Sequence, residues 1–471
     1  MVKNFDLVII GRGSAAFSAA IKASEITMHQ AKIAMIGYGY LGGTCVNVGC
    51  VPSKYLIEAA KVAQNQRYPK YPGIKSIEPS IDFKKLMNSL REVVNNEREN
   101  KYINVLKSYE NIEVFDGKSS FISNDTVKID SGEEMSGYNF IIATGSKTKI
   151  PDINGLRETG YLTSDTVWSL NYMPESLGII GGGFAGLELG QAFQRLGSHV
   201  AIIKEHETIV KGIENELGNE LIKALGEEGI QFLLKRKVKK VYKKGNKKII
   251  ETLHGNETEK IEVDEILMTS GRTPNIDNLG LEKAGIKYSE EGITVNDKLQ
   301  TSNPLIYAAG DVVHRKYKLE TLAAREGATI ASNLYENGSK KINLQEIPIS
   351  IFTEPQLASV GYTEKEYNEK FGKSMSRTIP LNFVPKARLL RENCGMFKIV
   401  IDEKTEKIVG VHVLSPYAAE FIIEGVNAIK NNLTYLDIIN STHIFPTVAE
   451  GIKLTAQSFY RNVSKMSCCM E

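Results

Sequence analysis

The stretch that most constrains the fold is FDLVIIGRGSAA, residues 5–16. Its first half is a short apolar run, typical of a strand buried in a parallel sheet. Its second half, with Gly11, Gly13 and Ala16 in the small positions, is the Gly/Ala form of the dinucleotide fingerprint and leads into an alanine-rich helix. Small residues there let the backbone approach a pyrophosphate, whose charge then lies at the helix N-terminus. We therefore predict a dinucleotide-binding unit at the start of the chain.

The same pattern returns as LGIIGGGFAG at residues 177–186, with Gly181, Gly183 and Gly186 in the small positions. A helix and a second strand at residues 199–203 are expected to follow. A lone fingerprint is weak evidence, but two of them, each between an apolar strand and a helix, predict two bound dinucleotides. Their order suggests a flavoprotein whose nicotinamide domain is inserted into its flavin domain.

Later stretches indicate where the flavin domain resumes. IIATGS at residues 141–146 marks the crossing into the inserted domain, and MTSGRTPN (268–275) and LIYAAGD (305–311) fit the return. The last of these ends in Gly310 and Asp311, which can bring a carboxylate to a ribityl hydroxyl and amides to a phosphate. The expected fold is α/β, with two Rossmann-like dinucleotide-binding domains for FAD and NAD(P) and a C-terminal α+β domain. The predicted boundaries are 1–150 and 269–342 for the FAD-binding domain, 151–268 for the NAD(P)-binding domain and 343–471 for the third domain.

Composition excludes several classes of protein. The 471 residues carry 58 basic and 56 acidic side chains, so a net charge of +2 gives no field that would recruit nucleic acid or a membrane. The basic run at residues 235–248 alternates with valine and contains a Gly-Asn turn, so we expect a solvated hairpin. No signal peptide and no apolar stretch of about 18 residues is visible, and we predict a cytoplasmic protein.

Two cysteine pairs carry the candidate chemistry. Cys45 and Cys50 lie in GGTCVNVGCVPSK (42–54), ahead of a probable helix start whose positive end favours the thiolate of Cys50. Such a thiolate attacks a disulfide or binds a metal. The adjacent Cys468 and Cys469 near the C-terminus can hold a soft metal. Cys394 is unpaired, and we interpret it as incidental.

Taken together, these motifs resemble the pyridine nucleotide-disulfide oxidoreductases, the family of glutathione reductase and dihydrolipoamide dehydrogenase, across essentially the whole chain. The run at 42–54 is highly specific to that family. Within the family, the Cys468-Cys469 ending and NFVPKAR at 382–388 resemble the mercuric reductases.

The resemblance implies FAD as the bound cofactor, NADPH or NADH as the hydride donor, and a redox-active Cys45–Cys50 disulfide on the opposite face of the flavin. It implies that Cys50 is the flavin-proximal thiolate, that Cys45 is the interchange thiol, and that Lys54 pairs with Glu188. It also implies a homodimer through the third domain, in which Cys468 and Cys469 of one subunit pass Hg(II), carried as a thiol complex, to Cys45 and Cys50 of the other. The remaining implied site residues are Tyr161 and Glu450 for catalysis and, for the cofactors, Gly43, Thr44, Lys54, Gly117, Ala143, Thr144, Gly145, Lys204, Glu205 and Gly271, with the fingerprint residues, Gly310 and Asp311.

Three positions depart from the family pattern. The acid expected at the end of the second strand, where it would bind the adenosine ribose, is replaced by Gly37, so either another group holds the ribose or flavin affinity is lower. The His that serves thiol protons five positions before the Glu is Phe445 here, and mercuric reductases commonly carry Tyr at that place. His443, two positions away, is a further candidate. Lys204 and Glu205 leave the choice between NADH and NADPH open.

The leading hypothesis is FAD-dependent reduction of Hg(II) to Hg(0) by NAD(P)H. The missing His argues against organic disulfides as substrates, because one sulfur must be deprotonated as the other leaves. A dihydrolipoamide dehydrogenase or other disulfide reductase is the alternative within the same fold. A metal-sequestering protein without turnover and a purely structural flavoprotein are the alternatives outside it.

Overall fold

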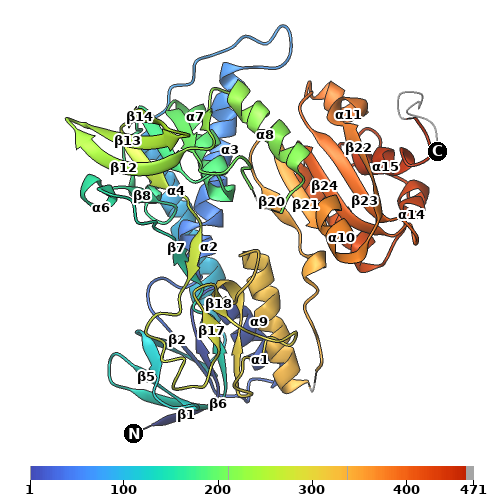
Figure 1. Cartoon of the computed structure of the whole chain (residues 1–471). Helices are drawn as coiled ribbons and strands as arrows, with labels where there is room; N and C mark the ends of the chain where they lie inside the picture. The colour runs from blue at the N-terminus through green and yellow to red at the C-terminus, as the bar shows by residue number, and fades with distance from the viewer. Residues whose placement is uncertain (1, 211, 337, 463–471) are drawn as a thin grey trace.

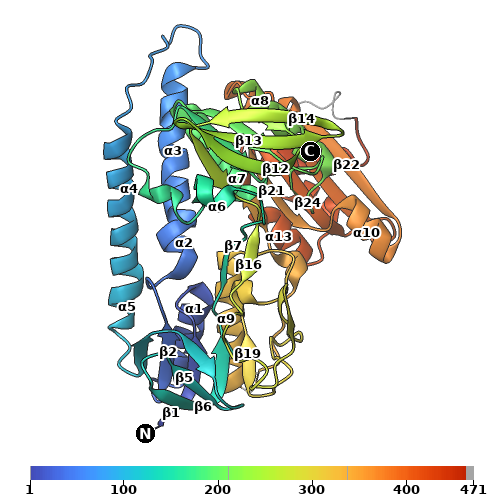
Figure 2. The same ribbon diagram turned by 60° about the vertical axis from the view of Figure 1, so that its left-hand side comes forward.

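The computed structural model of the chain describes residues 2–210, 212–336 and 338–462. Figure 1 shows three bodies: a lower one built from the beginning and the middle of the chain, an upper one coloured green, and an orange one formed by the C-terminal part. The helices α3 (Cys50–Arg67) and α4 (Phe83–Arg98) run side by side from the top of the molecule toward the lower body (Figure 2). The predicted mixed α/β class is confirmed.

The lower body, the first dinucleotide unit, is built on one seven-stranded sheet of order β3-β2-β1-β6-β5-β4, with β19 paired to β6. The strands β1, β2, β3, β6 and β19 are parallel, and β4 and β5 form an antiparallel extension. The bounds are β1 (Lys3–Ile10), β2 (Ile33–Gly37), β3 (Ile112–Asp116), β4 (Ser119–Phe121), β5 (Thr126–Ile129), β6 (Glu134–Ile142) and β19 (Ile306–Ala308).

Both faces of this sheet are buried, as the apolar run of β1 predicts. Leu7 and Ile9 join one core cluster, and Val8 and Ile10 join another, because successive side chains of a strand point to opposite faces. The first cluster is covered by α1 (Ser14–Ile26) and α9 (Glu320–Tyr335), which come from distant parts of the sequence and pack together. Gly327 makes that contact possible, since a Cβ there would lie 2.1 Å from the Ala15 carbonyl oxygen.

The green body, the second dinucleotide unit, contains a parallel sheet of order β11-β10-β9-β15-β8. Beside it lies an antiparallel sheet, β12-β13-β14, whose first two strands are the predicted basic hairpin. The chain enters and leaves this unit through β7 (Ser146–Thr148) and β16 (Arg272–Pro274), which pair with each other. The bounds are β8 (Leu162–Thr163), β9 (Ser176–Ile180), α7 (Phe184–Leu196), β10 (His199–Ile203), α8 (Asn215–Glu227), β11 (Gln231–Leu233), β12 (Lys237–Lys244), β13 (Lys247–His254), β14 (Glu257–Val263) and β15 (Glu265–Met268).

The C-terminal body is an antiparallel sheet of order β20-β21-β24-β23-β22 flanked by helices. Its core cluster joins β21, β22, β23 and β24 to the helices that follow them. The bounds are β20 (Ile349–Ile351), β21 (Gln356–Gly361), α10 (Glu364–Phe371), β22 (Ser374–Pro380), α11 (Pro385–Leu389), β23 (Met396–Asp402), β24 (Ile408–Ser415), α12 (Ala418–Phe421), α13 (Ile423–Lys430), α14 (Tyr435–Asn440) and α15 (Glu450–Gln457).

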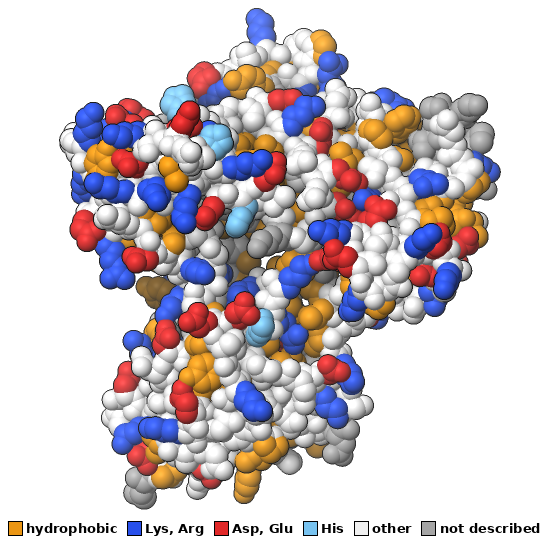
Figure 3. Space-filling model, in the orientation of Figure 1, with side chains coloured by type: hydrophobic (Ala, Val, Ile, Leu, Met, Phe, Trp, Pro, Cys, Tyr) orange, Lys and Arg blue, Asp and Glu red, His pale blue; other side chains and the backbone are white. Residues whose placement is uncertain are grey.

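Acidic and basic side chains alternate over the face shown in Figure 3, in keeping with the small net charge. Within the described ranges, no helix combines the length and the apolar character that crossing a membrane requires.

Candidate active site and nucleotide cavities

The thiols of Cys45 and Cys50 lie at the junction of two helices. Cys45 belongs to the short helix α2 (Gly43–Val48), and Cys50 is the first residue of α3. The chain turns sharply before α2, where Gly42 and Gly43 have φ of 88° and 63°, values that favour glycine. Both cysteines are free thiols, and Cys50 is exposed.

The two thiols have opposite tendencies to ionise. A hydrogen bond to Cys50, together with burial, raises the pKa of Cys45. The same hydrogen bond, with the positive charge of Lys54, lowers the pKa of Cys50, although the protein around its sulfur, which partly excludes water even though the residue is exposed, opposes that shift. A charge on Cys50 is favoured because the neighbouring thiol donates to it and a cation lies close by. The two thiols are therefore unequal, and Cys50 loses its proton more readily than Cys45.

Lys54 is held in place from two sides. Its Nζ lies 2.8 Å from Glu188 Oε2 and 4.4 Å from the centre of the Phe352 ring. Glu188 is buried, and its other carboxylate oxygen accepts a hydrogen bond of 2.9 Å from the Phe352 backbone N–H. The pairing of Lys54 with Glu188 expected from the resemblance is thus present, and it joins α3 to α7.

Two residues near the thiols were missed by the sequence reasoning. Tyr102 lies on a π-helical turn, η1 (Glu99–Ile103), and its ring packs edge-on against Phe17 at 4.8 Å. Burial raises the pKa of Tyr102 to about 12, with further contributions from the charges of Cys45 and Glu320. The carboxylate of Glu320, the first residue of α9, also raises the pKa of both cysteines. No local motif marks either residue, because both reach the thiols through tertiary packing.

A cavity of about 580 Å³ opens at the carboxyl ends of the strands of the first unit. Its walls include eight of the predicted cofactor residues: Gly11, Gly13, Gly43, Thr44, Gly117, Ala143, Thr144 and Gly145. The cradle depends on glycine, since a Cβ on Gly43 would lie 2.7 Å from Gly13 Cα, and one on Gly11 would lie 2.1 Å from the Ala143 carbonyl oxygen. Because these turns carry no side chains, their backbone can closely approach a dinucleotide pyrophosphate.

Polar side chains line one end of this cavity. Ser146, Asp165 and Arg272 belong to its wall. Arg272 donates a hydrogen bond of 2.7 Å to the Ser146 hydroxyl, which donates one of 2.6 Å to Oδ2 of Asp311, a residue outside the wall. Arg272 Nη1 also lies 3.5 Å from Asp165 Oδ1, a buried oxygen that accepts no hydrogen bond from the described residues. Such a set fits the hydroxyls of a ribityl chain. Ala16, Lys54, Gly271, Gly310 and Asp311, also predicted, lie outside the cavity walls.

At the place expected for the ribose-binding acid, the structure has an arginine beside Gly37. A Cβ on Gly37 would lie 2.7 Å from Arg12 Cγ, so Arg12 occupies the space that a side chain there would need. Arg12 is itself buried. Its position inside the fingerprint gave no hint of this, because the fingerprint leaves that residue unspecified.

The second fingerprint has the same tight construction. Gly181 has φ of 117°, and a Cβ on it would lie 2.5 Å from the Thr269 carbonyl oxygen; one on Gly186 would lie 2.4 Å from the Gly181 carbonyl oxygen. Lys204 follows β10 and packs its stem against Gly182, while its ammonium group donates to the Ile209 carbonyl oxygen. The surroundings are mixed in charge, because Glu205 faces Lys237 at 3.8 Å. The other predicted residues of this unit are Gly183, the N-cap of α7, and Tyr161, which packs on a core cluster.

The loop that precedes α15 carries the departures seen in the sequence. Phe445 is half exposed, and Glu450 Oε2 accepts a hydrogen bond of 3.1 Å from the Thr447 N–H. His443 faces Glu424 Oε1 at 2.9 Å and the Ser441 carbonyl oxygen at 3.2 Å, and the carboxylate raises its pKa. Both ring nitrogens of His443 therefore meet acceptors, and neither is left for a thiol proton. Cys468 and Cys469 lie outside the described residues.

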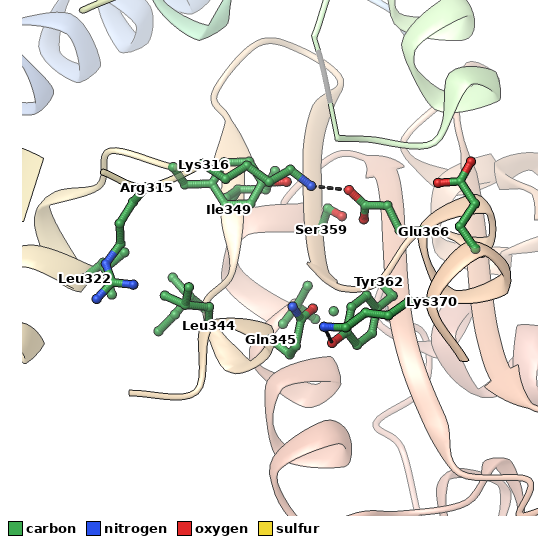
Figure 4. A pocket seen from close by; sticks show the side chains of 15 residues that line it. Arg315, Lys316, Leu322, Leu344, Gln345, Ile349, Ser359, Tyr362, Glu366 and Lys370 are labelled. Carbon is green, nitrogen blue, oxygen red and sulfur yellow. Dashed lines mark hydrogen bonds and ion pairs between the residues drawn. The ribbon is translucent and has the colours of Figure 1, made fainter. Parts of the chain in front are cut away.

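A second cavity, of about 480 Å³, lies between the segment after β19, the linker into β20 and the C-terminal sheet. Figure 4 shows Lys316 reaching across it to Glu366 and Lys370 lying against Tyr362. Arg315 and Glu369 pair instead with Glu326 and Lys365, which do not line the cavity. None of the predicted site residues within the described ranges lines it.

Comparison with known proteins agrees with this geometry. The profile described as "Pyridine nucleotide-disulphide oxidoreductase" matches residues 5–327, and that of the family's dimerisation domain matches residues 347–456. Mercuric reductases of Lysinibacillus sphaericus and Staphylococcus aureus are 38% and 36% identical to the chain, over 99% of its length and 84% of theirs. Among solved structures, the Cu(II) complex of the HOCl-induced flavoprotein disulfide reductase RclA from Escherichia coli superposes with a TM-score of 0.86 at 27% identity, covering 98% of this chain and 100% of that one.

Proposed function

Because this chain belongs to the pyridine nucleotide-disulphide oxidoreductase family, we propose that it reduces Hg(II) to Hg(0) with electrons from NAD(P)H. Its cofactors are FAD and NAD(P)H. The observation that carries the proposal is the pair of free thiols at Cys45 and Cys50 beside the Lys54–Glu188 ion pair, with the pKa of Cys50 lowered and that of Cys45 raised.

This pair suits a soft metal ion. Hg(II) prefers thiolate ligands, so the Cys50 thiolate binds it first, and Cys45 loses its proton as its sulfur becomes the second ligand. When bound, FAD relays two electrons from NAD(P)H to the dithiol site, and the overall reaction gives Hg(0), NAD(P)+ and one proton. Lys54 keeps the Cys50 thiolate charged, and Glu188 keeps Lys54 in position.

Organic disulfides are poorer candidates because their reduction needs a group that moves thiol protons. Phe445 has no such group, and both ring nitrogens of His443 face acceptors. Exchange of a metal between thiolates needs less proton transfer. Among the described side chains near the thiols, Cys45, Lys54 and Tyr102 carry protons, and burial keeps Tyr102 neutral by raising its pKa to about 12.

We further propose that a second copy of the chain completes the site. In one chain, α15 and the loop before it lie in the C-terminal body, away from α2 (Figure 1). Glu450, Phe445 and the pair Cys468 and Cys469 then reach Cys45 and Cys50 from the partner subunit, and the terminal pair delivers Hg(II) from its thiol complex. Tyr161 remains a candidate catalytic residue. A supply of NAD(P)H and reduced thiols places this reaction in the cytoplasm.

The test follows NAD(P)H oxidation and loss of mercury from solution after Hg(II) is added with excess thiol. Cys50→Ser should abolish mercury-dependent oxidation, because a hydroxyl neither binds Hg(II) as a thiolate nor accepts electrons. Cys394→Ser is the matched control. Its thiol has a pKa raised to about 12 by burial and by Glu220, so it is neutral, and the variant should keep the wild-type rate. A flavin-loaded dimer that oxidises NAD(P)H no faster with Hg(II) than without it contradicts the proposal.

The RclA structure favours a second candidate, a reductase of disulfides or of copper, since that neighbour is a disulfide reductase solved with Cu(II). Turnover of lipoamide or of Cu(II) faster than that of Hg(II), by the same flavin-loaded dimer, would make this candidate the better one.

A further inference from the structure

The end of β2 lacks the acid that would bind the adenosine ribose, yet its backbone does not demand glycine. Gly37 has no left-handed φ, so any residue could adopt its conformation. A Cβ there would nevertheless lie 2.7 Å from Arg12 Cγ and 3.1 Å from Arg12 Cδ. Arg12, and not the path of the chain, is therefore what requires glycine at this position.

The guanidinium of Arg12 joins the ends of two strands. Its Nη1 donates to the Gly39 carbonyl oxygen at 3.1 Å and its Nη2 to the Phe115 carbonyl oxygen at 2.9 Å. Nη2 also lies 2.6 Å from Asp116 Oδ1. A buried cation needs such partners, because an unpaired one would be strongly destabilising. The amino nitrogens of Arg12 thus fix one carboxylate oxygen of Asp116 at the end of β3.

Asp116 stands one strand away from the position where the acid was expected. It is the last residue of β3, and it pairs in register with Gly37. Ligands of doubly wound sheets bind at the carboxyl ends of the strands, which is where both residues lie. The residues around Asp116 line the nucleotide cavity, namely Arg12, Gly37, Gly117 and Lys118. The Asp116 side chain is 89% exposed, so its second oxygen is accessible.

We propose that Asp116, positioned by Arg12, binds the adenosine ribose of FAD in place of the missing acid at the end of β2. The ribose hydroxyls donate hydrogen bonds to the carboxylate, and such charge-assisted bonds are stronger than neutral ones. Arg12 is a positioning residue, since Nη1 and Nη2 are used by the two carbonyl oxygens and by Asp116, while its buried Nε has no hydrogen-bond partner among the described residues. The carboxylate thus lies at the end of β3 and not at the end of β2. Arg12, which fills the space beside Gly37, holds Asp116 in this position. This inference concerns retention of FAD and does not depend on the identity of the substrate.

The experiment measures how fast the holoenzyme releases FAD, followed by the recovery of flavin fluorescence after dilution. Asp116→Asn should speed release about 10-fold or more, because a charged acceptor is lost. Glu113→Gln is the matched control. It removes an exposed carboxylate from the same strand, three residues before the strand end that carries Asp116, and should change the rate less than twofold. Release from Asp116→Asn at the wild-type rate overturns the proposal.

A change of ligand separates recognition of the ribose from general damage to the fold. An FAD analogue that carries 2′,3′-dideoxyadenosine has no ribose hydroxyls that could donate hydrogen bonds to Asp116. We expect Asp116→Asn to leave the release of this analogue unchanged within twofold. Equal acceleration for FAD and for the analogue would show that the substitution only loosens the structure, and it would overturn the assignment.

A swap of residues tests the role of Arg12. The double substitution Arg12→Ser with Gly37→Glu removes the obstructing side chain and returns an acid to the end of β2. Added to Asp116→Asn, it should bring FAD release back toward the wild-type rate. Gly37→Glu alone should speed release, since its Cβ would collide with Arg12. If Gly37→Glu alone retains FAD as well as the swap does, Arg12 is not what excludes the acid.

Discussion

The two dinucleotide units have the same backbone arrangement at the glycine turn, but a glycine and a long basic side chain occupy opposite positions in them. The N–H of Gly11 bonds to the Ile36 carbonyl oxygen, and that of Gly181 bonds to the Ile203 carbonyl oxygen, so Gly37 and Lys204 hold equivalent positions. In the first unit the long cation, Arg12, comes from the fingerprint and the glycine from the strand end. In the second the strand end supplies the cation, Lys204, and the fingerprint supplies Gly182.

The exchange changes what each unit presents to a nucleotide. Arg12 points back into the protein and holds Asp116, so the first unit presents a carboxylate. Lys204 lies at the strand end with its stem on Gly182, so the second unit presents a positive charge beside the nucleotide turn. The fingerprint therefore fixes how a pyrophosphate is held, while the contact to the ribose is chosen by residues around it.

The units also differ in how they are fixed to the C-terminal body, because a charged cluster around the buried Lys398 holds the second unit. The substitution Lys398→Met tests this contact and has the largest expected effect on stability. Lys398 is buried on β23, and its Nζ lies 3.1 Å from Glu214 and Glu216 of the second unit and 3.0 Å from Glu364 of α10. Its loss leaves several carboxylates facing one another without a cation, at a cost of about 3–5 kcal/mol. We expect a lower urea midpoint of unfolding, measured by circular dichroism.

Lys365→Met is the control for that experiment, because Lys365 is 81% exposed and lies 3.8 Å from Glu369. An exposed ion pair of this kind contributes about 0–1 kcal/mol. If both variants unfold at the same urea concentration, the charged cluster does not fix the second unit.

The third fingerprint position distinguishes the units next. The first unit carries Ala16 there, whereas a Cβ on Gly186 would lie 2.4 Å from the Gly181 carbonyl oxygen and 2.7 Å from Thr269 Oγ1. Gly186→Ala should therefore cost about 1–3 kcal/mol through overpacking and should weaken NAD(P)H binding, measured by titration of flavin reduction.

The same substitution at Gly226, in α8, meets no atom within 4 Å and serves as the control. It should be neutral or should stabilise the protein by about 0.4–1 kcal/mol. If Gly186→Ala binds NAD(P)H as well as the wild type does, the second turn accommodates an alanine at this position as the first turn does.

The smallest expected effect concerns nucleotide choice. An acid at the strand end binds the 2′-hydroxyl of NADH, whereas basic residues accommodate the phosphate of NADPH. We expect Lys204→Glu to shift the ratio of kcat/KM for NADPH over that for NADH at least tenfold toward NADH. Lys223→Glu, which changes the same charge on an exposed site of α8, should leave the ratio unaltered. An unchanged ratio in Lys204→Glu would place the ribose away from this strand end.

Much of the fold was predictable because its signals are local. The apolar strands and glycine turns at 5–16 and 177–186 each lie in one continuous segment, so the sequence was enough to predict two dinucleotide units and the α/β class, which is confirmed. The alternating lysines at 235–248 likewise predicted their hairpin. Tyr102 and Glu320 were not predictable, because a π-helical turn and the start of a distant helix bring them to the thiols.

The sequence by itself determined the two fingerprints, the thiol pair at Cys45 and Cys50, and the absence of an acid at Gly37 and of a histidine at 445. Only the tertiary structure decided that both nitrogens of His443 face acceptors, that Tyr102 and Glu320 lie near the thiols, and that Arg12 pairs with Asp116 at the end of β3. The reason is physical. A glycine turn is specified by the conformations its own residues allow, whereas the state of a charge depends on burial and on partners that packing brings together, such as Arg12 and Asp116, which lie more than a hundred residues apart in the sequence.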